Sequence, residues 1–408
     1  MSKQVRKSQL LALSKTTAAV VLALAMVIYP QEVLSSAYQG ILMWGKYVLP
    51  ALLPFFILSE LLMGAGFVHL LGVVLEPIMR PVFRLPGCAG FVVAMGFTSG
   101  PPIGAILTAK LRKENLLSRV EAERLLTFTN NASPGFMLGA VAAGMFGNPG
   151  LGLALAFSNY LANLLLGIAM RYYKPTPLET AQPTSNVSLG RKAFRAMYYA
   201  QRKDARPLGQ LIGDSVRNSI NTILLVGGFI LFFSVMLRLL SILGVTALIA
   251  KVLAVLLAPL KLDSSLFSAI SSGLFEMTLG TKLASEASGP IMQKIPLVSA
   301  LMAWSGISVH AQVASFTSGT DIRLTPFVIG RLAQTGLSAV LIIVLLNFTP
   351  SITVFSALGA GLTPWKTEIL VLALAVFSTA ALCFGVGILF GLLRRGFASL
   401  SKFSRPPC

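Results

Sequence analysis

Charged residues are scarce in this sequence, and acidic residues are the scarcest. Asp and Glu number 14 and Lys and Arg number 33 among 408 residues, so 12% of the chain is charged while 55% is hydrophobic. Soluble domains typically carry about 25% charged residues. The composition therefore excludes an ordinary soluble fold and indicates a protein that resides in lipid.

Cysteine and histidine are also few. The cysteines are Cys88, Cys383 and Cys408, with no CxxC pair, and the histidines are His69 and His310. None of these spacings suits a metal site, so we expect free thiols, no metal and no cofactor. The chain also lacks GxSxG, Walker A and HExxH motifs, and no nucleophile and base form a recognisable pair. We therefore expect that the protein is not an enzyme.

Long apolar stretches, in contrast, are plentiful. A helix needs about 20 apolar residues to cross a hydrocarbon core of roughly 30 Å. Eight stretches approach or exceed that length, so we predict an all-α integral membrane protein with about eight crossings. They lie at residues 13–29, 41–63, 125–146, 151–170, 220–240, 297–316, 327–347 and 369–393.

The net charge of +19 comes from Lys and Arg clustered between the apolar stretches. No DNA- or RNA-binding motif surrounds them, so nucleic acid is not an expected partner. Loops rich in Lys and Arg stay on the cytoplasmic side, so the clusters mark the inner face of the cell membrane. They lie at residues 3–15, 110–124, 171–217 and 394–405, which places both termini in the cytoplasm.

The N-terminus also resembles a signal peptide. Basic residues precede the apolar stretch 17–28, and the small residues Ser35, Ser36 and Ala37 follow it. Removal of this segment would leave an odd number of crossings between two basic clusters that we place on the same side. We therefore expect the first helix to be retained.

An internal repeat is visible at an offset of 177 residues. Phe55-Phe56 aligns with Phe232-Phe233, and Gly96 aligns with Gly273. Each of these glycines lies in a Gly-rich apolar segment that is followed by a polar break and then by another apolar stretch with polar residues at its centre. The chain thus contains two related halves.

Each half contains a segment that is long enough to span but is interrupted near its middle. Gly100-Pro101-Pro102 interrupts residues 88–111, and the region 276–280 interrupts residues 264–285. Because proline removes a backbone donor and clashes with the preceding turn, a straight helix through the two prolines is unfavourable. We predict a re-entrant broken hairpin in each half, whose tip is tolerated at membrane depth where protein groups or a water-filled cavity satisfy the backbone.

If the N-terminus is cytoplasmic, the number of crossings before each hairpin sets the side from which it enters the membrane. The first hairpin then enters from the cytoplasmic side and the second from the opposite side. The halves then form an inverted-topology repeat, as in many secondary transporters, with sites near the midplane where broken helices meet. The predicted organisation is an N-terminal helix and short loop (1–40), a first repeat (41–170), a basic cytoplasmic loop (171–218), a second repeat (219–348) and a C-terminal helix with a basic tail (349–408).

Four segments resemble a known family. They are GFTSGPPIGA (96–105) with TFTNNASPGF (127–136), and LFEMTLGTK (274–282) with WSGISVHAQ (304–312). Their pairing resembles the nucleoside-recognition, or Gate, family, which includes segments of ferrous iron transporter B proteins, spore maturation proteins A and B and, more distantly, concentrative nucleoside transporters. Over nearly its whole length the chain is most similar to sporulation integral membrane proteins.

The resemblance implies a multi-pass cell-membrane protein of a spore-former that is needed for making the spore cortex. The sequence departs from the transporter relatives in two respects. The first hairpin tip has no clear acidic partner, and the second has a single carboxylate, Glu276. The resemblance therefore does not imply nucleoside specificity.

In the second half, Glu276 is the sharpest candidate, because a carboxylate inside an apolar segment is costly unless it is paired, protonated or solvated. A shallower hairpin would instead place Glu276 at an aqueous interface, and Lys282 either pairs with it or marks the surface. His310 lies in the middle of an apolar stretch, with Ser308 nearby. A titrating histidine relays protons near neutral pH, whereas a buried neutral one bonds to an adjacent helix.

In the first half, Asn130, Asn131 and Ser133 occupy the corresponding place. Their polar groups suit a polar ligand or a cation, or else hold the bundle together. Thr98 and Ser99 precede the first break and offer hydroxyls at a half-helix N-terminus, where an anionic group is favoured. We interpret Asn159 and Asn163 as packing groups. The predicted substrate-binding residues are Thr98, Ser99, Asn130, Asn131, Ser133, Glu276, Ser308 and His310.

The central loop alternates basic and aromatic residues between Arg191 and Arg206, including Phe194, Tyr198 and Tyr199. Such a segment beside a membrane helix typically lies on anionic lipid headgroups, and protein binding is the alternative. Two functions of different classes follow. One is a secondary transporter or permease-like protein for a small polar solute. The other is a non-transporting scaffold that recruits sporulation proteins of cortex assembly.

Overall fold

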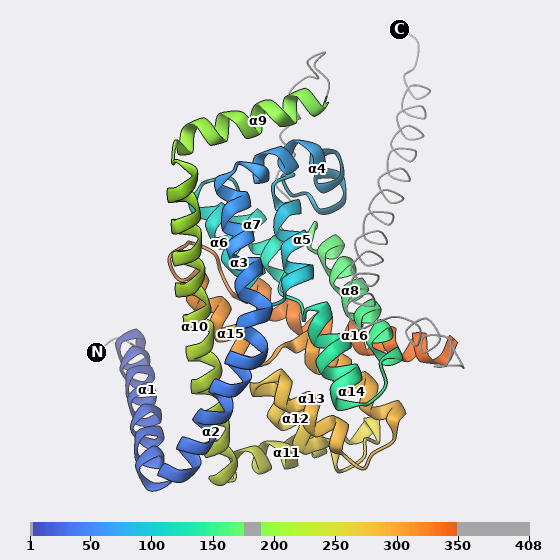
Figure 1. Cartoon of the computed structure of the whole chain (residues 1–408). Coiled ribbons are helices and arrows are strands. Elements are labelled where there is room, and N and C mark those ends of the chain that lie inside the picture. The colour runs from blue at the N-terminus through green and yellow to red at the C-terminus, as the bar shows by residue number, and fades with distance from the viewer. Residues whose placement is uncertain (1–2, 175–188, 349–408) are drawn as a thin grey trace.

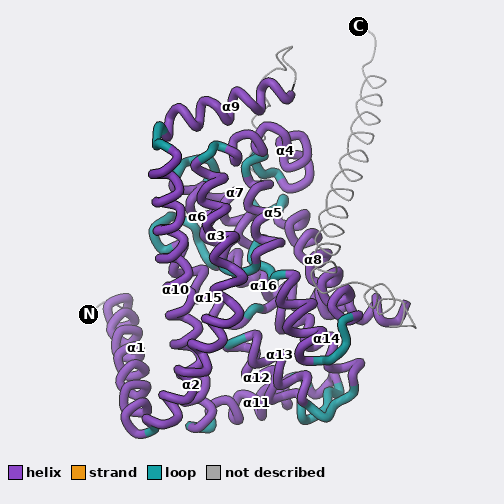
Figure 2. Tube along the Cα trace, viewed as in Figure 1, coloured by secondary structure: helices purple, strands orange, loops and turns teal. Residues whose placement is uncertain are grey.

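The computed structural model describes residues 3–174 and 189–348, and within those residues it contains helices and loops but no strand (Figures 1 and 2). Four helices are long and apolar enough to cross a membrane, or up to six if each of two bent helix pairs is one span. The prediction of an all-α integral membrane protein is thereby confirmed. The predicted crossing 369–393 and the C-terminal segment 349–408 lie outside the described residues.

The N-terminal elements are α1 (Lys3–Ile28), α2 (Pro30–Met43), the π-helical turn η1 (Trp44–Val48) and α3 (Leu49–Gly64). The chain bends by 103° between α1 and α2, where Pro30 begins the second helix. Proline is favoured at that position because the first helical N–H has no intrahelical partner. The predicted crossing 13–29 thus ends one residue beyond α1, and 41–63 runs from the end of α2 through α3.

The first half continues with α4 (Phe67–Phe83), which is bent by 83° from α3, and with the two short helices of the first hairpin. It ends with a broken helix and one long helix. These elements are α5 (Ala89–Ser99), α6 (Ile103–Lys113), α7 (Arg119–Phe128), the π-helical η2 (Gly135–Met145) and α8 (Gly150–Met170).

The second half repeats this order after α9 (Leu189–Asp204). Its elements are α10 (Leu208–Ile242), α11 (Val245–Leu256), the short 3-10 turn η3 (Ala258–Leu260), α12 (Leu266–Phe275), α13 (Met277–Glu286), α14 (Ile291–Trp304), α15 (Gly306–Thr317) and α16 (Thr325–Phe348). At 35 residues, α10 is roughly 52 Å long and extends beyond a hydrocarbon core.

Backbone conformations recur between the halves. Arg84 ends α4 and Lys261 ends η3, both left-handed with φ of 52° and 50°, and they lie at the repeat offset of 177 residues. Gly66 precedes α4 and Gly244 precedes α11, with φ of 72° and 75°, one residue from that offset. The two halves therefore share their local backbone pattern. Their inverted orientation relative to a membrane stays a prediction.

Both hairpin segments are broken at the positions that the sequence indicates. Residues 100–102 separate α5 from α6, and Glu276 alone, in an extended conformation, separates α12 from α13. In each hairpin the two short helices pack against one another.

The predicted crossing 125–146 is not formed by one helix. Helix α7 ends at Phe128, residues 129–133 are not helical, and η2 follows Pro134. The physical reason is local, because Pro134 lacks a backbone N–H and the asparagines before it bind nearby backbone groups instead of continuing the helix. The corresponding stretch 297–316 is also interrupted, at Ser305 with φ of 68°, although α14 and α15 together still form one candidate span.

One end of the molecule is held by polar contacts between distant segments. Glu60 accepts bonds from Lys110 at 2.8 Å and from Asn218 at 3.4 Å, so the end of α6, where the basic cluster 110–124 begins, lies beside α3 and α10. Helix α9 lies across this end and is tied to the α3–α4 turn by Gln201, which donates to the Ala65 carbonyl at 2.9 Å (Figure 1). Two clusters that the sequence assigns to the cytoplasm thus occur at the same end.

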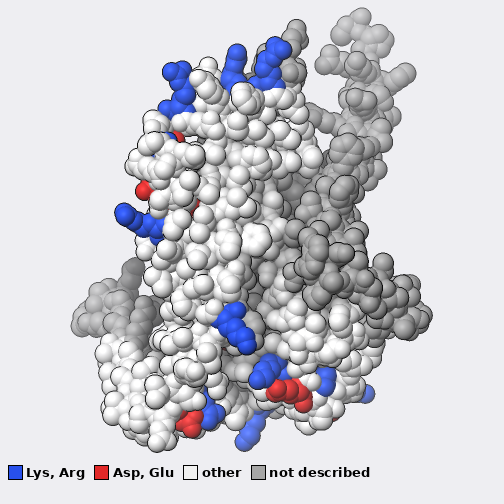
Figure 3. Space-filling view, viewed as in Figure 1, with Lys and Arg blue, Asp and Glu red and all other residues white. Residues whose placement is uncertain are grey.

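The loop between α15 and α16 closes over the same end. Arg112 binds the two carboxylate oxygens of Asp321 at 2.8 and 3.1 Å, which holds the pKa of that carboxyl below its usual range. The buried carboxylate of Glu123 accepts from Tyr173 and lies 3.6 Å from Arg323. On the visible face, Lys and Arg gather at the end with α9 and at the end with α11, and much of the surface between them is uncharged (Figure 3).

Glycines permit the close approach of the first hairpin to the broken helix. A Cβ added at Gly96 or at Gly104 would overlap the carbonyl oxygen of Thr129, which lies between the two short helices. In the second hairpin, a Cβ at Gly280 would overlap the backbone of Gly273 on the facing helix. Small residues allow such approaches between helices in membranes.

We expect Gly104→Ala to destabilise the protein by roughly 1–3 kcal/mol, because the added methyl group must displace the Thr129 carbonyl. The matched control is Gly228→Ala in α10, where a Cβ meets nothing within 4 Å. Thermal unfolding of the two purified variants in detergent measures the difference. Equal melting temperatures would contradict this packing.

Candidate functional site

The first hairpin tip lies against the break that follows α7. Gly100, with φ of 88°, turns the chain at the tip, and a Cβ there would lie 3.1 Å from the Cβ of Ser133. Ser99 is buried beside it, and Thr98 is half-buried, with its hydroxyl 3.5 Å from that of Ser99. The structure therefore brings three predicted residues of the first half together: Thr98, Ser99 and Ser133. The prediction that Thr98 and Ser99 lie at a helix N-terminus is wrong, because they form the last turn of α5, where Thr98 donates to the Ala94 carbonyl at 3.0 Å.

The two asparagines of the break are buried and bonded to protein groups. Asn130 accepts the Ala105 N–H at 3.0 Å through its Oδ1 atom and donates to the Leu126 carbonyl at 3.1 Å. Asn131 donates to the Phe128 carbonyl at 3.3 Å and accepts a bond from Asn163 of α8. These amides hold the break in place and join it to the start of α6.

The second hairpin tip is arranged differently, around a carboxylate. Glu276 accepts the backbone N–H groups of Thr278 at 3.0 Å and Leu279 at 2.7 Å, so it caps the N-terminus of α13, where a negative charge is favoured. Lys282 is exposed and lies 4.0 Å from Glu286, so it marks the surface and does not pair with Glu276.

The second tip also lies against the break of the next helix. A Cβ at Gly306 would lie 3.0 Å from the Cα of Glu276 and 2.7 Å from the Phe275 carbonyl oxygen. His310 bonds back to the Gly306 carbonyl at 2.8 Å, and its ring lies 4.3 Å from that of Trp304. Ser308 is on the buried face of α15, one turn from Gln312. Glu276 and His310 thus flank the same break.

A buried arginine, Arg331 of α16, joins the two breaks. Its Nη1 atom donates to the carbonyls of Asn130 at 2.8 Å and Ala303 at 3.1 Å. Its Nη2 atom donates to the Thr127 carbonyl at 3.0 Å and to the amide oxygen of Asn163 at 3.3 Å. One guanidinium therefore binds the ends of α7 and α14, which belong to different halves.

The surroundings of Arg331 explain how its charge is accommodated. Three of its four acceptors are backbone carbonyls at or just beyond helix C-termini, where the helix dipole favours a cation. These carbonyls lack intrahelical partners, so the guanidinium satisfies groups that would otherwise be unpaired away from water. Among the described residues no carboxylate forms an ion pair with Arg331.

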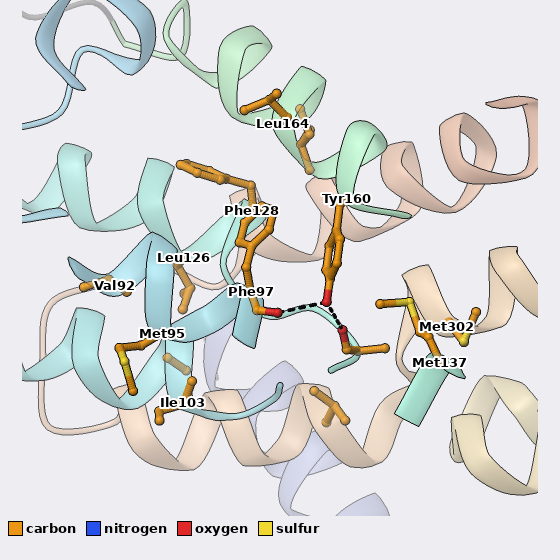
Figure 4. Close-up of a cluster of buried hydrophobic side chains, with 14 of the residues drawn as sticks. Val92, Met95, Phe97, Ile103, Leu126, Phe128, Met137, Tyr160, Leu164 and Met302 are labelled. Carbon is orange, nitrogen blue, oxygen red and sulfur yellow. Dashed lines mark hydrogen bonds between the residues drawn. The ribbon is translucent and has the colours of Figure 1, made fainter. Parts of the chain in front are cut away.

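Helix α8 supplies two more side chains to the first break. Tyr160 donates to the Phe97 carbonyl at 2.9 Å and reaches the Ala132 carbonyl at 3.4 Å, while its ring stacks on that of Phe97 (Figure 4). It thus connects the end of α5 with the break after α7. Asn163 connects Asn131 with Arg331, so the interpretation of Asn163 as a simple packing group is too narrow.

Sequence reasoning missed Arg331, although a signal was present. Arg331 lies inside the predicted crossing 327–347, and an ionisable residue within a membrane helix is by default a candidate for function. Its position near the start of that stretch makes it resemble one more basic residue of the cytoplasmic face. Tyr160 carried no comparable signal, because tyrosine is common in membrane helices.

Comparisons with known proteins match the first half of the chain to a family and most of the chain to a relative. The family model described as nucleoside recognition, named Gate, matches residues 46–149, which run from η1 to the loop after η2. The sporulation integral membrane protein YlbJ of Bacillus subtilis (strain 168) is 47% identical to the chain over 319 residues, which are 78% of each protein. No solved structure matches the chain.

We expect Arg331→Met to cost roughly 3 kcal/mol or more, because it leaves several buried acceptors without a donor. Arg331→Lys should fall between this variant and the wild type, since it keeps the charge but has fewer donors. The control is Arg238→Met, which removes an exposed ion pair with Glu32 and should cost at most about 1 kcal/mol. Melting temperatures in detergent test this order, and an Arg331→Met variant as stable as the control would refute the role of Arg331.

Proposed function

Because the chain belongs to the family of the sporulation integral membrane protein YlbJ, we propose that it is a multi-pass cell-membrane protein that carries a small polar solute during spore formation. The observation that carries the proposal is the meeting of two hairpin tips with two helix breaks, joined by Arg331. Broken helices that meet from two halves are the usual setting of solute sites in secondary transporters.

The polar groups at the breaks supply the chemistry for such a site. Arg331 and the amides of Asn130 and Asn131 now bond to protein carbonyls, whereas Thr98, Ser99 and Ser133 place hydroxyls at the first tip. A solute that offers its own acceptors and donors replaces some of these bonds at little net cost, because hydrogen bonds are exchanged and not lost. We call this bonded arrangement, in which protein groups satisfy one another, the closed state.

The family provides two leads on the solute. The matching model is described as nucleoside recognition, so nucleosides are the first compounds to test. The relative is a sporulation protein, which favours compounds that cross membranes during spore formation. The proposal assigns no enzymatic step to the chain.

A second candidate function rests on α9. Its small residues Ala193 and Ala200 face inward, and Ala200 approaches Gly66 of the α3–α4 turn. The opposite face leaves Phe194 and Tyr198 exposed among arginines. This basic and aromatic surface fits anionic lipid headgroups, or an acidic protein recruited to a scaffold that does not transport.

Heat-resistant spore yield in a spore-forming host separates the two functions. We expect Glu276→Gln to lower the yield roughly tenfold or more at normal protein abundance, because it removes the charge at the second tip. The matched control is Glu286→Gln, an exposed carboxylate on the same helix, which should behave as wild type. A variant with Arg191, Arg195 and Arg202 changed to Gln should also sporulate normally. Failure of this α9 variant alone would favour the scaffold.

The proposed orientation is tested by labelling single cysteines with a membrane-impermeant maleimide, after Cys88, Cys383 and Cys408 are replaced by Ser. Tyr199→Cys in α9 should react in inside-out vesicles and stay unlabelled on intact cells, because we place that end in the cytoplasm. Lys251→Cys in α11 should show the opposite pattern. Labelling of Tyr199→Cys on intact cells would overturn the orientation.

A further inference from the structure

The hydrogen bond of His310 assigns the position of its proton. The Nδ1 atom lies 2.8 Å from the Gly306 carbonyl oxygen, which has lone pairs but no hydrogen. Nδ1 must therefore carry the hydrogen of the neutral ring and donate it. The other nitrogen, Nε2, is then the unprotonated one and has a lone pair that is free to accept.

Nε2 of His310 is buried and has no hydrogen-bond partner among the described residues. The ring is enclosed by Trp304, with centroids 4.3 Å apart, and by Phe327, with centroids 5.0 Å apart. A buried acceptor without a donor is unfavourable unless it serves a purpose, because its desolvation is not compensated. The lone pair of Nε2 is the one place on this ring where a proton can bind.

Among the residues that the structure describes, one charged residue lies close to this ring. Arg331 contacts the same Phe327 ring, with the guanidinium carbon 5.6 Å from its centroid, and opposes a second positive charge on the imidazole. The backbone of Glu276 packs against Gly306, but its carboxylate bonds to the N–H groups of Thr278 and Leu279. Arg331 is therefore the charged group that acts on the imidazole at the break.

The helices packed against α15 carry other charged residues, but these are engaged or exposed. Helices α6, α10 and α12 make those contacts, and α12 itself has no charged residue. Ion pairs engage Lys110, Arg112, Asp214 and Arg238, and the remaining Lys113 and Arg217 are exposed.

We infer that Nε2 of His310 is a reversible proton-binding site and that the proton is the ion coupled to solute movement. A proton from the aqueous side binds the Nε2 lone pair, Nδ1 keeps its own hydrogen, and the ring becomes an imidazolium. The same bond to Nε2 breaks when the proton leaves. This inference rests on the proposed transport function.

Protonation has a direct consequence for the closed state. The imidazolium places a second positive charge beside the Phe327 ring that Arg331 also contacts, and the bonds of Arg331 join the two breaks. Repulsion between the two cations weakens the attachment of Arg331 to the ends of α7 and α14. Proton binding thus favours separation of the breaks, and their closure favours proton release.

The small number of histidines allows a direct test. The chain has two, and His69→Gln leaves His310 as the single source of imidazole signals. The full-length variant, labelled with ¹⁵N-histidine and reconstituted in lipid nanodiscs, is followed by NMR across pH. We expect a single hydrogen on Nδ1 at alkaline pH, and a second one that appears on Nε2 as the pH is lowered. A hydrogen on Nε2 at alkaline pH, or an imidazole that does not titrate, would overturn the inference.

A second variant tests the link to Arg331. In His69→Gln with Arg331→Gln, removal of the neighbouring cation should move the midpoint of the His310 titration upward by about one pH unit. An unchanged midpoint in a folded variant would contradict the coupling to Arg331. If the double variant does not fold, the titration of His310 in the His69→Gln variant decides the inference. Failure of the two proposals is distinguishable, because solute movement with a non-titrating His310 refutes only the proton site. A titrating His310 in a protein that moves no solute refutes transport instead.

Discussion

Backbone carbonyls freed inside a membrane protein must find donors, and this constraint organises the described structure. The helices α7 and α14 both end in the interior, where water does not replace the missing intrahelical bonds. Arg331 satisfies carbonyls of both helices with one planar group, and the dipoles of the helix ends stabilise its charge. The other contacts of the site, which include those of Asn163 and Tyr160, lie around Arg331 and the two helix ends.

The same physics explains why the two tips differ although their backbones correspond. The first tip is formed by glycine and proline residues, and the asparagine amides beside it bond to nearby carbonyls. None of these groups carries a charge. The second tip is closed by a carboxylate that binds backbone amides at the start of α13. A cation joined to helix C-termini and an anion joined to a helix N-terminus thus share the interior without pairing directly, and each is stabilised by backbone dipoles.

Ion pairs of another kind stabilise the end of the molecule that carries α9. There the second half reaches the first through the α15–α16 loop, where Arg112 binds Asp321 and Glu123 lies beside Arg323. The Arg112 pair is partly exposed and contributes little by itself, whereas Glu123 is fully buried and has several partners. The two halves are therefore joined by a buried cation at the helix breaks and by ion pairs at the end of the molecule that carries α9.

The sequence alone determined that the chain resides in lipid, because the apolar stretches leave no alternative, and it determined where both hairpins break, because proline and an intrusive carboxylate act within a few residues of the chain. It indicated the polar groups at 130–133 and a proline that loosens the helix after them, but not that residues 129–133 leave the helix altogether. Tertiary structure decided their partners: Arg331 meets Asn130 across 201 residues, and Lys282 faces outward instead of pairing with Glu276. Local breaks follow from steric and hydrogen-bonding rules that act on neighbouring residues. The donor that satisfies a freed carbonyl depends on which helix packs beside it, and only the folded chain decides that.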